Sequence, residues 1–226
     1  MRKTFLFFIV LALTVSALAK QRESVGKMRA FQVLKSVIHR YEAATGVKCK
    51  IKRTVTISLL DQTKVSKGEL SLSQGRVRVD LNAPDPATIV FDKSLVWVVT
   101  PTPKELGGRT QVLKMKSTAI DRESQAPIAL LLGNEKAWDL FKVSSQKREG
   151  HLLTVSLEKK KPSAEGIQTI ELRVDTQKNE IEKLSYSDDL ENETSFKFNR
   201  TDFGVKMPNS VFDFVPPKNA EITVVN

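Results

Sequence analysis

The stretch GELSLSQGRVRVDLNAPDPATIVFDKSLVWVVT, residues 68–100, decides the fold, because apolar and polar side chains alternate through its successive segments. Side chains of a β-strand point to opposite faces in turn, so each segment has one apolar side. The stretch predicts a curved antiparallel sheet whose apolar face must be covered. The alternating apolar positions are Leu70, Leu72, Val77, Val79, Leu81, Ile89, Phe91, Leu95, Trp97 and Val99.

The last two segments predict a hairpin register. A three-residue loop of residues 92–94 would place Phe91 opposite Leu95 and Ile89 opposite Trp97, so that both apolar sets share one face. We therefore expect the three-residue loop.

The first 19 residues have the features of a secretory signal. Arg2-Lys3 precede an apolar run, and Ala17-Leu18-Ala19 forms a small-x-small cleavage site. An uncleaved membrane anchor is the alternative, although the apolar run is short for a full span. We expect residues 20–226 to form one mature domain that is free in an extracytoplasmic space, without a lipid anchor, since Lys20 is not a cysteine.

The composition limits the chemistry. Without Arg2 and Lys3 the chain keeps 34 basic and 26 acidic side chains, a net charge of +8. This surplus favours anionic surfaces such as phospholipid headgroups, or serves general solubility, while a nucleic-acid footprint is not evident.

Cys49 is the one cysteine, which excludes an intramolecular disulfide and predicts a small buried residue. His39 and His151 are read as surface residues rather than metal ligands or bases.

Common catalytic motifs are missing from the sequence. The pair Asp188-Asp189 is expected to shape a turn, and an enzyme that uses only carboxylates remains an alternative. No metal or cofactor is expected.

Apolar residues recur at threes and fours over residues 22–44, which predicts an amphipathic helix that ends at Gly46 and packs on the sheet. The next segment, residues 49–60, predicts a strand. Arg53 interrupts its apolar face, either reaching solvent at a strand end or engaging a polar group inside. Later hairpins and a final strand at residues 211–215, before Pro216-Pro217, bring the expected total to about ten strands.

Residues 126–140 contain the apolar burst Ile128-Ala129-Leu130-Leu131-Leu132, which is stopped by Gly133. Short helices are expected here. They either belong to the core or form a lid that can open over the sheet.

The order of these features resembles the periplasmic outer-membrane lipoprotein carriers, the LolA family. The resemblance lies in the signal, the helix, the strand GELSL at 68–72, the hairpin IVFDKSLVW at 89–97, the leucine-rich segment and the closing FDFVPP at 212–217. It implies an unclosed antiparallel β-barrel of about 10–11 strands, with the N-terminal helix and short lid helices over a hydrophobic cavity that holds lipoprotein acyl chains. Two positions depart from the family pattern: Lys93 replaces a glycine, and Gln74 replaces an arginine linked to lid closure and release. Arg53, Arg76 and Arg78 are candidates for that arginine's role.

The resemblance implies a carrier without covalent chemistry, acting as a monomer. Its partners would be acylated lipoproteins, an inner-membrane ABC-type exporter and an outer-membrane acceptor, but not nucleic acid. A lipid- or lipoprotein-sensing module that ferries no cargo is the second hypothesis. The predicted cavity wall is Ile57, Leu59, Leu70, Leu72, Val77, Val79, Ile89, Phe91, Leu95 and Trp97, and the predicted lid is Ile128, Leu131 and Leu132.

Overall fold

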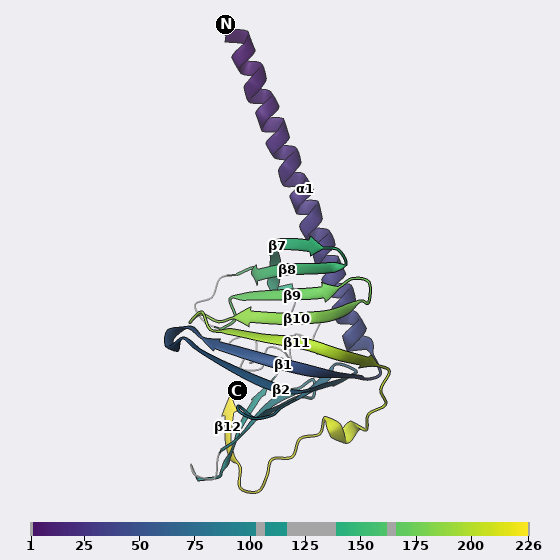
Figure 1. The fold of residues 1–226 in the computed structure, drawn as a ribbon, viewed down its shortest axis with the longest axis vertical. Helices are drawn as coiled ribbons and strands as arrows, with labels where there is room; N and C mark the ends of the chain where they lie inside the picture. The colour runs from purple at the N-terminus through teal and green to yellow at the C-terminus, as the bar shows by residue number, and fades with distance from the viewer. Residues whose placement is uncertain (1, 103–106, 117–138, 162–165, 226) are drawn as a thin grey trace.

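The computed structural model describes residues 2–102, 107–116, 139–161 and 166–225, with side chains from residue 21 onward. One long helix is followed by twelve strands (Figure 1). The helix α1 covers Arg2–Ala43. The strands are β1 Val47–Ile57, β2 Gln62–Ser73, β3 Arg76–Leu81, β4 Ala87–Phe91, β5 Leu95–Pro101, β6 Thr110–Lys116, β7 Phe141–Glu149, β8 Leu152–Lys159, β9 Thr169–Asp175, β10 Glu180–Ser187, β11 Glu193–Phe203 and β12 Glu221–Val225.

All twelve strands form one open sheet in the order β12-β6-β5-β4-β3-β2-β1-β11-β10-β9-β8-β7. Neighbouring strands are antiparallel except β12, which pairs parallel with β6. The sheet curves around the C-terminal part of α1, which contacts β2, β7, β8 and β9 (Figure 1). The mainly β fold with an N-terminal helix and an unclosed sheet is therefore confirmed.

Two short segments differ from the expected strands. The chain turns through 3-10 helices at Ser58–Leu60 and Asn209–Val211, so β1 ends at Ile57. The predicted strand at 211–215 is wrong, because the N–H of Phe212 bonds back to the carbonyl of Asn209 instead of a neighbouring strand. Nor do Pro216-Pro217 end the sheet, since β12 follows them.

The helix is longer than expected, beginning at Arg2 and ending at Ala43. Its last three turns bury Leu34, Val37, Ile38 and Tyr41 within the core. Val25 and Met28, nearer its start, are exposed. Among the residues searched, no helix is both long and apolar enough to cross a membrane.

Candidate functional site

The concave face of the sheet is apolar across most of its width. Residues opposite one another on adjacent strands share a face, so the strand pairing defines rows of side chains that run across the sheet. One row is Val47, Leu72, Val77, Phe91, Val96 and Met115, and the next is Cys49, Leu70, Val79, Ile89, Val98 and Leu113. Beyond β1 the same face continues through Phe198, Phe196, Leu184, Leu172 and Val155.

Six of the predicted cavity residues lie together in these rows. Leu70, Leu72, Val77, Val79, Ile89 and Phe91 are all buried and belong to one apolar cluster with the helix residues Leu34, Val37, Ile38 and Tyr41. Cys49 is buried on the same face, as expected for a small apolar residue. Burial of the thiol raises its pKa.

Leu95 and Trp97 do not share this face with Phe91, because the predicted register of the β4–β5 hairpin is wrong. Phe91 pairs with Val96, and Trp97 pairs with Val90.

The turn chemistry explains this register. Asp92 and Leu95 close a two-residue turn through a 3.1 Å bond from the Asp92 N–H to the Leu95 carbonyl. The Asp92 carboxylate accepts the N–H groups of Ser94 and Leu95, and Lys93 adopts a positive φ of 86°. Burial acts to raise the pKa of Asp92, but these hydrogen bonds outweigh it and hold the pKa below its usual range.

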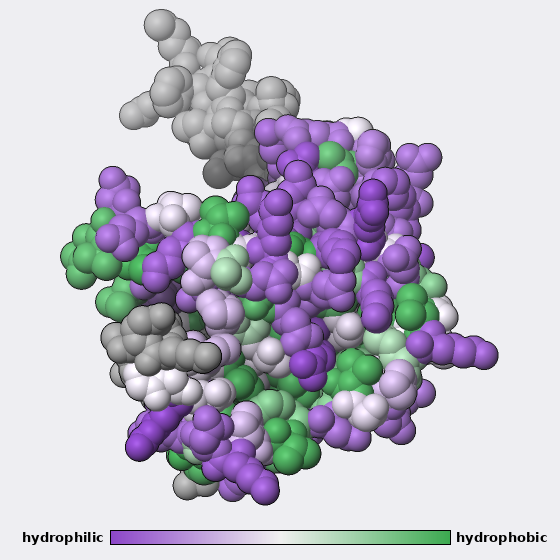
Figure 2. Space-filling model, turned by 60° about the horizontal axis from the view of Figure 1, so that its bottom comes forward, coloured by the Kyte–Doolittle hydropathy of each residue, from purple (hydrophilic) through white to green (hydrophobic). Residues whose placement is uncertain are grey.

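Ile57 and Leu59 lie at the tip of the β1–β2 hairpin. Ile57 is half-buried at the last position of β1, whereas Leu59 belongs to the short 3-10 helix and is 92% exposed. The hairpin protrudes from one edge of the molecule in Figure 1, and Figure 2 shows apolar side chains at that edge. The hairpin tip therefore places Leu59 in solvent instead of in a cavity wall.

The lid residues Ile128, Leu131 and Leu132 lie outside the described residues. Their role stays a prediction.

The outer face of β3–β6 is covered by the C-terminal segment. Trp97 contacts Phe214 with ring centroids 5.4 Å apart, and Phe212 is buried. Arg78 donates to the carbonyl of Val211 at 3.2 Å. Arg76 lies over the Phe212 ring. Arg76 and Arg78 thus hold the C-terminal segment on the outer face and do not reach the apolar concave face.

Arg53 is a cation on the concave face of β1. It sits between the buried residues Ser66 and Phe196 on adjacent strands, and its guanidinium is 3.5 Å from Asp85. Burial raises the pKa of Tyr186 to about 12, opposed by a hydrogen bond with Thr194 and by the charge of Arg53. Of the two readings of Arg53, the structure supports the one in which it engages polar groups inside.

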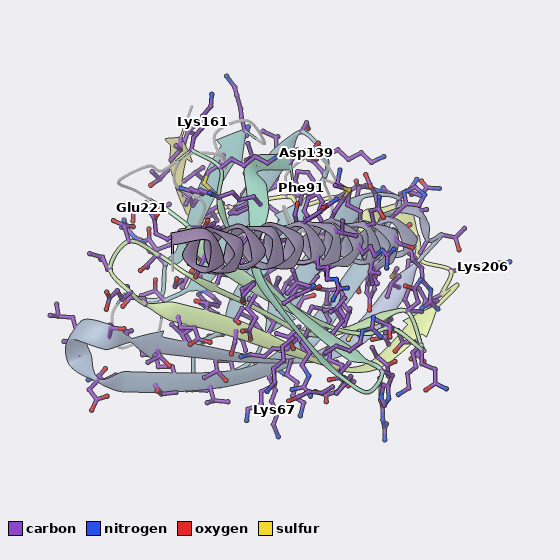
Figure 3. The ribbon with its side chains drawn as sticks, turned by 90° about the horizontal axis from the view of Figure 1, so that it is seen from above. Lys67, Phe91, Asp139, Lys161, Lys206 and Glu221 are labelled. Atoms are coloured by element: carbon purple, nitrogen blue, oxygen red, sulfur yellow. The ribbon has the colours of Figure 1, made fainter. Side chains whose placement is uncertain are left out.

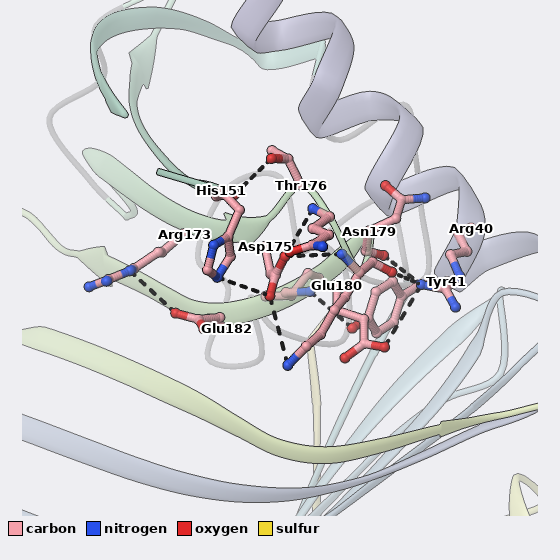
Figure 4. A network of polar contacts seen from close by, with 12 residues as sticks. Arg40, Tyr41, His151, Arg173, Asp175, Thr176, Asn179, Glu180 and Glu182 are labelled. Atoms are coloured by element: carbon pink, nitrogen blue, oxygen red, sulfur yellow. Dashed lines mark hydrogen bonds and ion pairs between the residues drawn. The ribbon is translucent and has the colours of Figure 1, made fainter. Parts of the chain in front are cut away.

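The C-terminal end of α1 is fixed to the β9–β10 turn by polar contacts (Figure 4). Arg40 donates to the carbonyls of Lys178 and Asn179 at 2.7 and 2.8 Å and stacks on Phe203. The hydroxyl of Tyr41 accepts the N–H of Ile181, and burial raises the pKa of Tyr41 to about 12. This end of the helix is therefore a fixed part of the core.

Further toward its N-terminus, α1 leaves a pocket between itself and β7–β8. The pocket has a volume of about 370 Å³ and is lined by Gly26, Arg29, Ala30, Val33, Gln146, Arg148 and Leu153. Sequence reasoning missed this pocket, because it depends on the distance between two elements more than a hundred residues apart.

The other polar residues singled out from the sequence make surface and turn contacts. His151 is exposed and 3.6 Å from Asp175, and Asp188 accepts N–H groups within its own turn, so it shapes the turn as expected. Within the described part of the chain, no group of three or more histidine, cysteine or acidic residues is arranged to hold a metal ion.

Comparison with known proteins identifies the family. Residues 43–215 match the family model of the outer membrane lipoprotein carrier protein LolA. The chain belongs to this family. It is 24% identical over 183 residues to an outer-membrane lipoprotein carrier protein of Methylobacillus flagellatus, a match that covers 80% of this chain and 84% of the relative. Together these similarities support a general role as a lipoprotein carrier.

Solved structures give weaker similarities. A LolA superfamily protein from Nitrosomonas europaea aligns with a TM-score of 0.45 at 10% identity, covering 82% of this chain and 97% of that one. An uncharacterized conserved protein from Thermus thermophilus aligns with a TM-score of 0.48 at 10% identity, covering 86% and 98%.

Proposed function

We propose that this chain is a periplasmic carrier that holds the acyl chains of lipoproteins against its concave face and moves them from the inner to the outer membrane. The observation that carries the proposal is the largely apolar concave face of an open sheet, with an amphipathic helix packed against it. Family membership supports the class of cargo. The signal-like residues 1–19 support the compartment.

The physical demand on such a carrier is to keep hydrocarbon out of water. Each exposed methylene costs about 0.8 kcal/mol, so an acyl chain can cross an aqueous compartment only when most of it is enclosed. An apolar face meets this demand without directional contacts and without covalent chemistry. The carrier therefore needs an enclosing surface and a cover that can open, but no catalytic group.

The described residues suggest where an acyl chain could enter. The pocket between α1 and β7–β8 contains the apolar groups of Ala30, Val33 and Leu153 and adjoins the buried cluster, of which Ala30 and Leu153 are members. Val98 and Leu113 on the other side of the concave face are only partly buried. An acyl chain that entered between α1 and the sheet would therefore lie against apolar surface that continues that of the pocket.

The cover is the second part of the proposal. In the proposed carrier, the lid consists of Ile128, Leu131 and Leu132. The partners are an ABC-type exporter at the inner membrane and an acceptor at the outer membrane. The carrier acts as a monomer. Substitution of Leu131 by glutamate should weaken acyl binding and leave the sheet folded, whereas normal cargo retention in that variant would contradict the lid assignment.

Native mass spectrometry of the protein purified from a bacterial periplasm tests the main proposal. Bound triacylated lipoprotein is the expected result. Free phospholipid alone, or an empty protein, would contradict the carrier function and favour a sensing module.

A matched pair of variants tests the binding face. Leu113 lies on the concave side of β6, whereas Leu190 is exposed in the β10–β11 turn. We expect Leu113→Glu to weaken binding of a fluorescent triacylated lipopeptide at least tenfold, since a carboxylate beside an acyl chain loses its hydration. Leu190→Glu should bind normally. Equal binding by both variants would exclude the β6 side of the face from the site.

A further inference from the structure

A row of cationic side chains crosses the convex face of the sheet. Strand pairing places five of them directly opposite one another on successive strands: Lys67 on β2, Lys52 on β1, Lys197 on β11, Lys183 on β10 and Arg173 on β9. We call these five residues the cationic row. In the next two strands the same register continues through Thr154 to Lys147.

The alternation of the strands sets the direction of the row. Phe196, Leu184 and Leu172, which neighbour the row residues in sequence, are buried on the concave face. The row therefore points to the opposite side. Figure 3 shows Lys67 extending away from the helix and the enclosed side of the sheet.

The two ends of the row differ in charge compensation. Arg173 is 3.3 Å from Glu182, and Lys183 is 3.8 Å from both Glu171 and Glu193. Lys52, Lys67 and Lys197 are exposed, and no described carboxylate lies within 4.0 Å of their amines. Lys50, two residues from Lys52, is itself paired with Glu69. Three adjacent lysines, on β2, β1 and β11, thus form the end of the row that has no described counter-charge.

This arrangement costs stability in the isolated protein. Like charges directly opposite on neighbouring strands repel, and strands lie only about 4.8 Å apart. An anionic partner on this face would convert the repulsion into attraction. The row spans about 19 Å across five strands at that spacing, so the partner must present negative charge over a similar length.

We propose that the cationic row docks the protein on the anionic headgroup surface of a phospholipid bilayer. Lysine ammonium groups on flexible stems attract a layer of mobile anionic lipids without a fixed pairing geometry, at about 1 kcal/mol for each lysine near the surface. The positions beside these three lysines on the same face are Thr54, Ser195 and Val65 on one side and Lys50, Asn199 and Glu69 on the other. None of these six residues is aromatic, so these positions lack the aromatic anchors that typically stabilise binding to a folded protein.

The docked orientation is compatible with enclosed cargo. Because the row and the apolar cluster lie on opposite faces, the bilayer would contact the convex side while the concave face stays covered. Docking in this way does not depend on acyl binding, so the vesicle experiment and the cargo experiment can fail independently.

Sedimentation with vesicles tests the proposal on the mature chain. The vesicles are phosphatidylcholine with or without 40% phosphatidylglycerol, at low and at physiological ionic strength. We expect binding only to the anionic vesicles, and weaker binding as salt is added. The triple variant Lys52→Gln, Lys67→Gln, Lys197→Gln should bind on the order of 100-fold more weakly.

The control variant changes net charge by the same amount elsewhere. Lys161, Lys206 and Lys218 are exposed, and Figure 3 shows Lys161 and Lys206 away from Lys67. Their triple glutamine variant should retain most of the binding. An equal loss of vesicle binding in the two triple variants would show that only net charge matters, and it would overturn the proposal. Binding of soluble polyglutamate with no binding to vesicles would assign the row to an acidic polypeptide and also overturn it.

Discussion

The two faces of the sheet differ in chemistry although the same strands form both: one is apolar and buried, and the other is charged and exposed. On the concave face of β1 and β2, residues such as Cys49 and Leu70 are buried in a continuous apolar cluster. On the convex face of the same strands, Lys52 and Lys67 stand in water with no counter-charge that the structure describes. Strand alternation makes this possible, because successive residues of a regular strand point to opposite faces.

The difference teaches which positions carry stability and which are available for binding. The apolar side is held by burial of hydrocarbon, whose contribution is large for each residue. The charged side contributes little or is unfavourable by itself. Substitutions on the two faces of one strand should therefore differ strongly in their effect on unfolding.

The largest effect is expected at Leu72, which is fully buried on the concave side of β2. Leu72→Ala should lower the free energy of unfolding by about 2–5 kcal/mol, through lost burial and the cavity left behind. Val65→Ala, on the convex side of the same strand, should change it by less than about 0.5 kcal/mol. Urea denaturation of the mature chain measures both, and similar losses would contradict the difference between the faces.

A second expectation concerns alkaline pH. Tyr41 and Tyr186 are the two tyrosines of the chain, and burial raises the pKa of each from 10 to about 12. A raised folded-state pKa gives stability that is complete below the unfolded-state pKa and is lost as pH rises through the folded-state value. The free energy of unfolding should therefore fall between pH 10 and pH 12, by up to about 1.4 kcal/mol per pH unit for each tyrosine.

The matched variants for this expectation are Tyr41→Phe and Tyr186→Phe. The quantity to compare is the slope of unfolding free energy against pH, since removing the Tyr41 hydroxyl also leaves the N–H of Ile181 without its 3.1 Å acceptor. The double variant should give a flatter slope between pH 10 and pH 12. An unchanged slope would show that neither hydroxyl is shielded from solvent.

A smaller effect is expected where the C-terminal segment covers the outer face. Arg78 joins Asp80 through two hydrogen bonds of 2.7 and 2.9 Å and also reaches the carbonyl of Val211. Both side chains are partly in water, so Arg78→Ala should cost about 1 kcal/mol. Limited proteolysis should show faster cleavage near residues 209–215. Slower or unchanged cleavage would mean that Arg78 does not hold the segment.

The alternation of apolar residues was enough to predict most strands, because each amphipathic strand carries its own signal. It failed where side-chain hydrogen bonds set the geometry, as when Asp92 selects a two-residue turn and moves Trp97 to the outer face. It also failed for β12, a short edge strand whose Ile222 and Val224 are both exposed, so burial leaves no pattern there.

The candidate site was predicted only in part for a related reason. Leu70 and Leu72 belong to strands with clear periodicity, and they lie where the alternation put them. The partner of Arg53, Asp85, is 32 residues away in a loop, and such a pairing has no local signal. The cationic row combines strands from residue 52 to residue 197, so it becomes visible only when their register is known.

The smallest expected effect is a gain in stability from a substitution on the convex face. Lys52 stands between Lys67 and Lys197, so Lys52→Glu would replace two cross-strand repulsions with two attractions. Unfolding should then require about 0.2–1 kcal/mol more for each new pair, and added salt should reduce the gain. Lys206→Glu, with the same change of net charge on an exposed loop, is the control and should show little change. If Lys52→Glu raises the free energy of unfolding and also lowers the affinity for anionic vesicles, then the lysines destabilise the fold and at the same time support membrane binding. A destabilised one would mean that the lysines do not repel one another, and that the row needs no anionic partner.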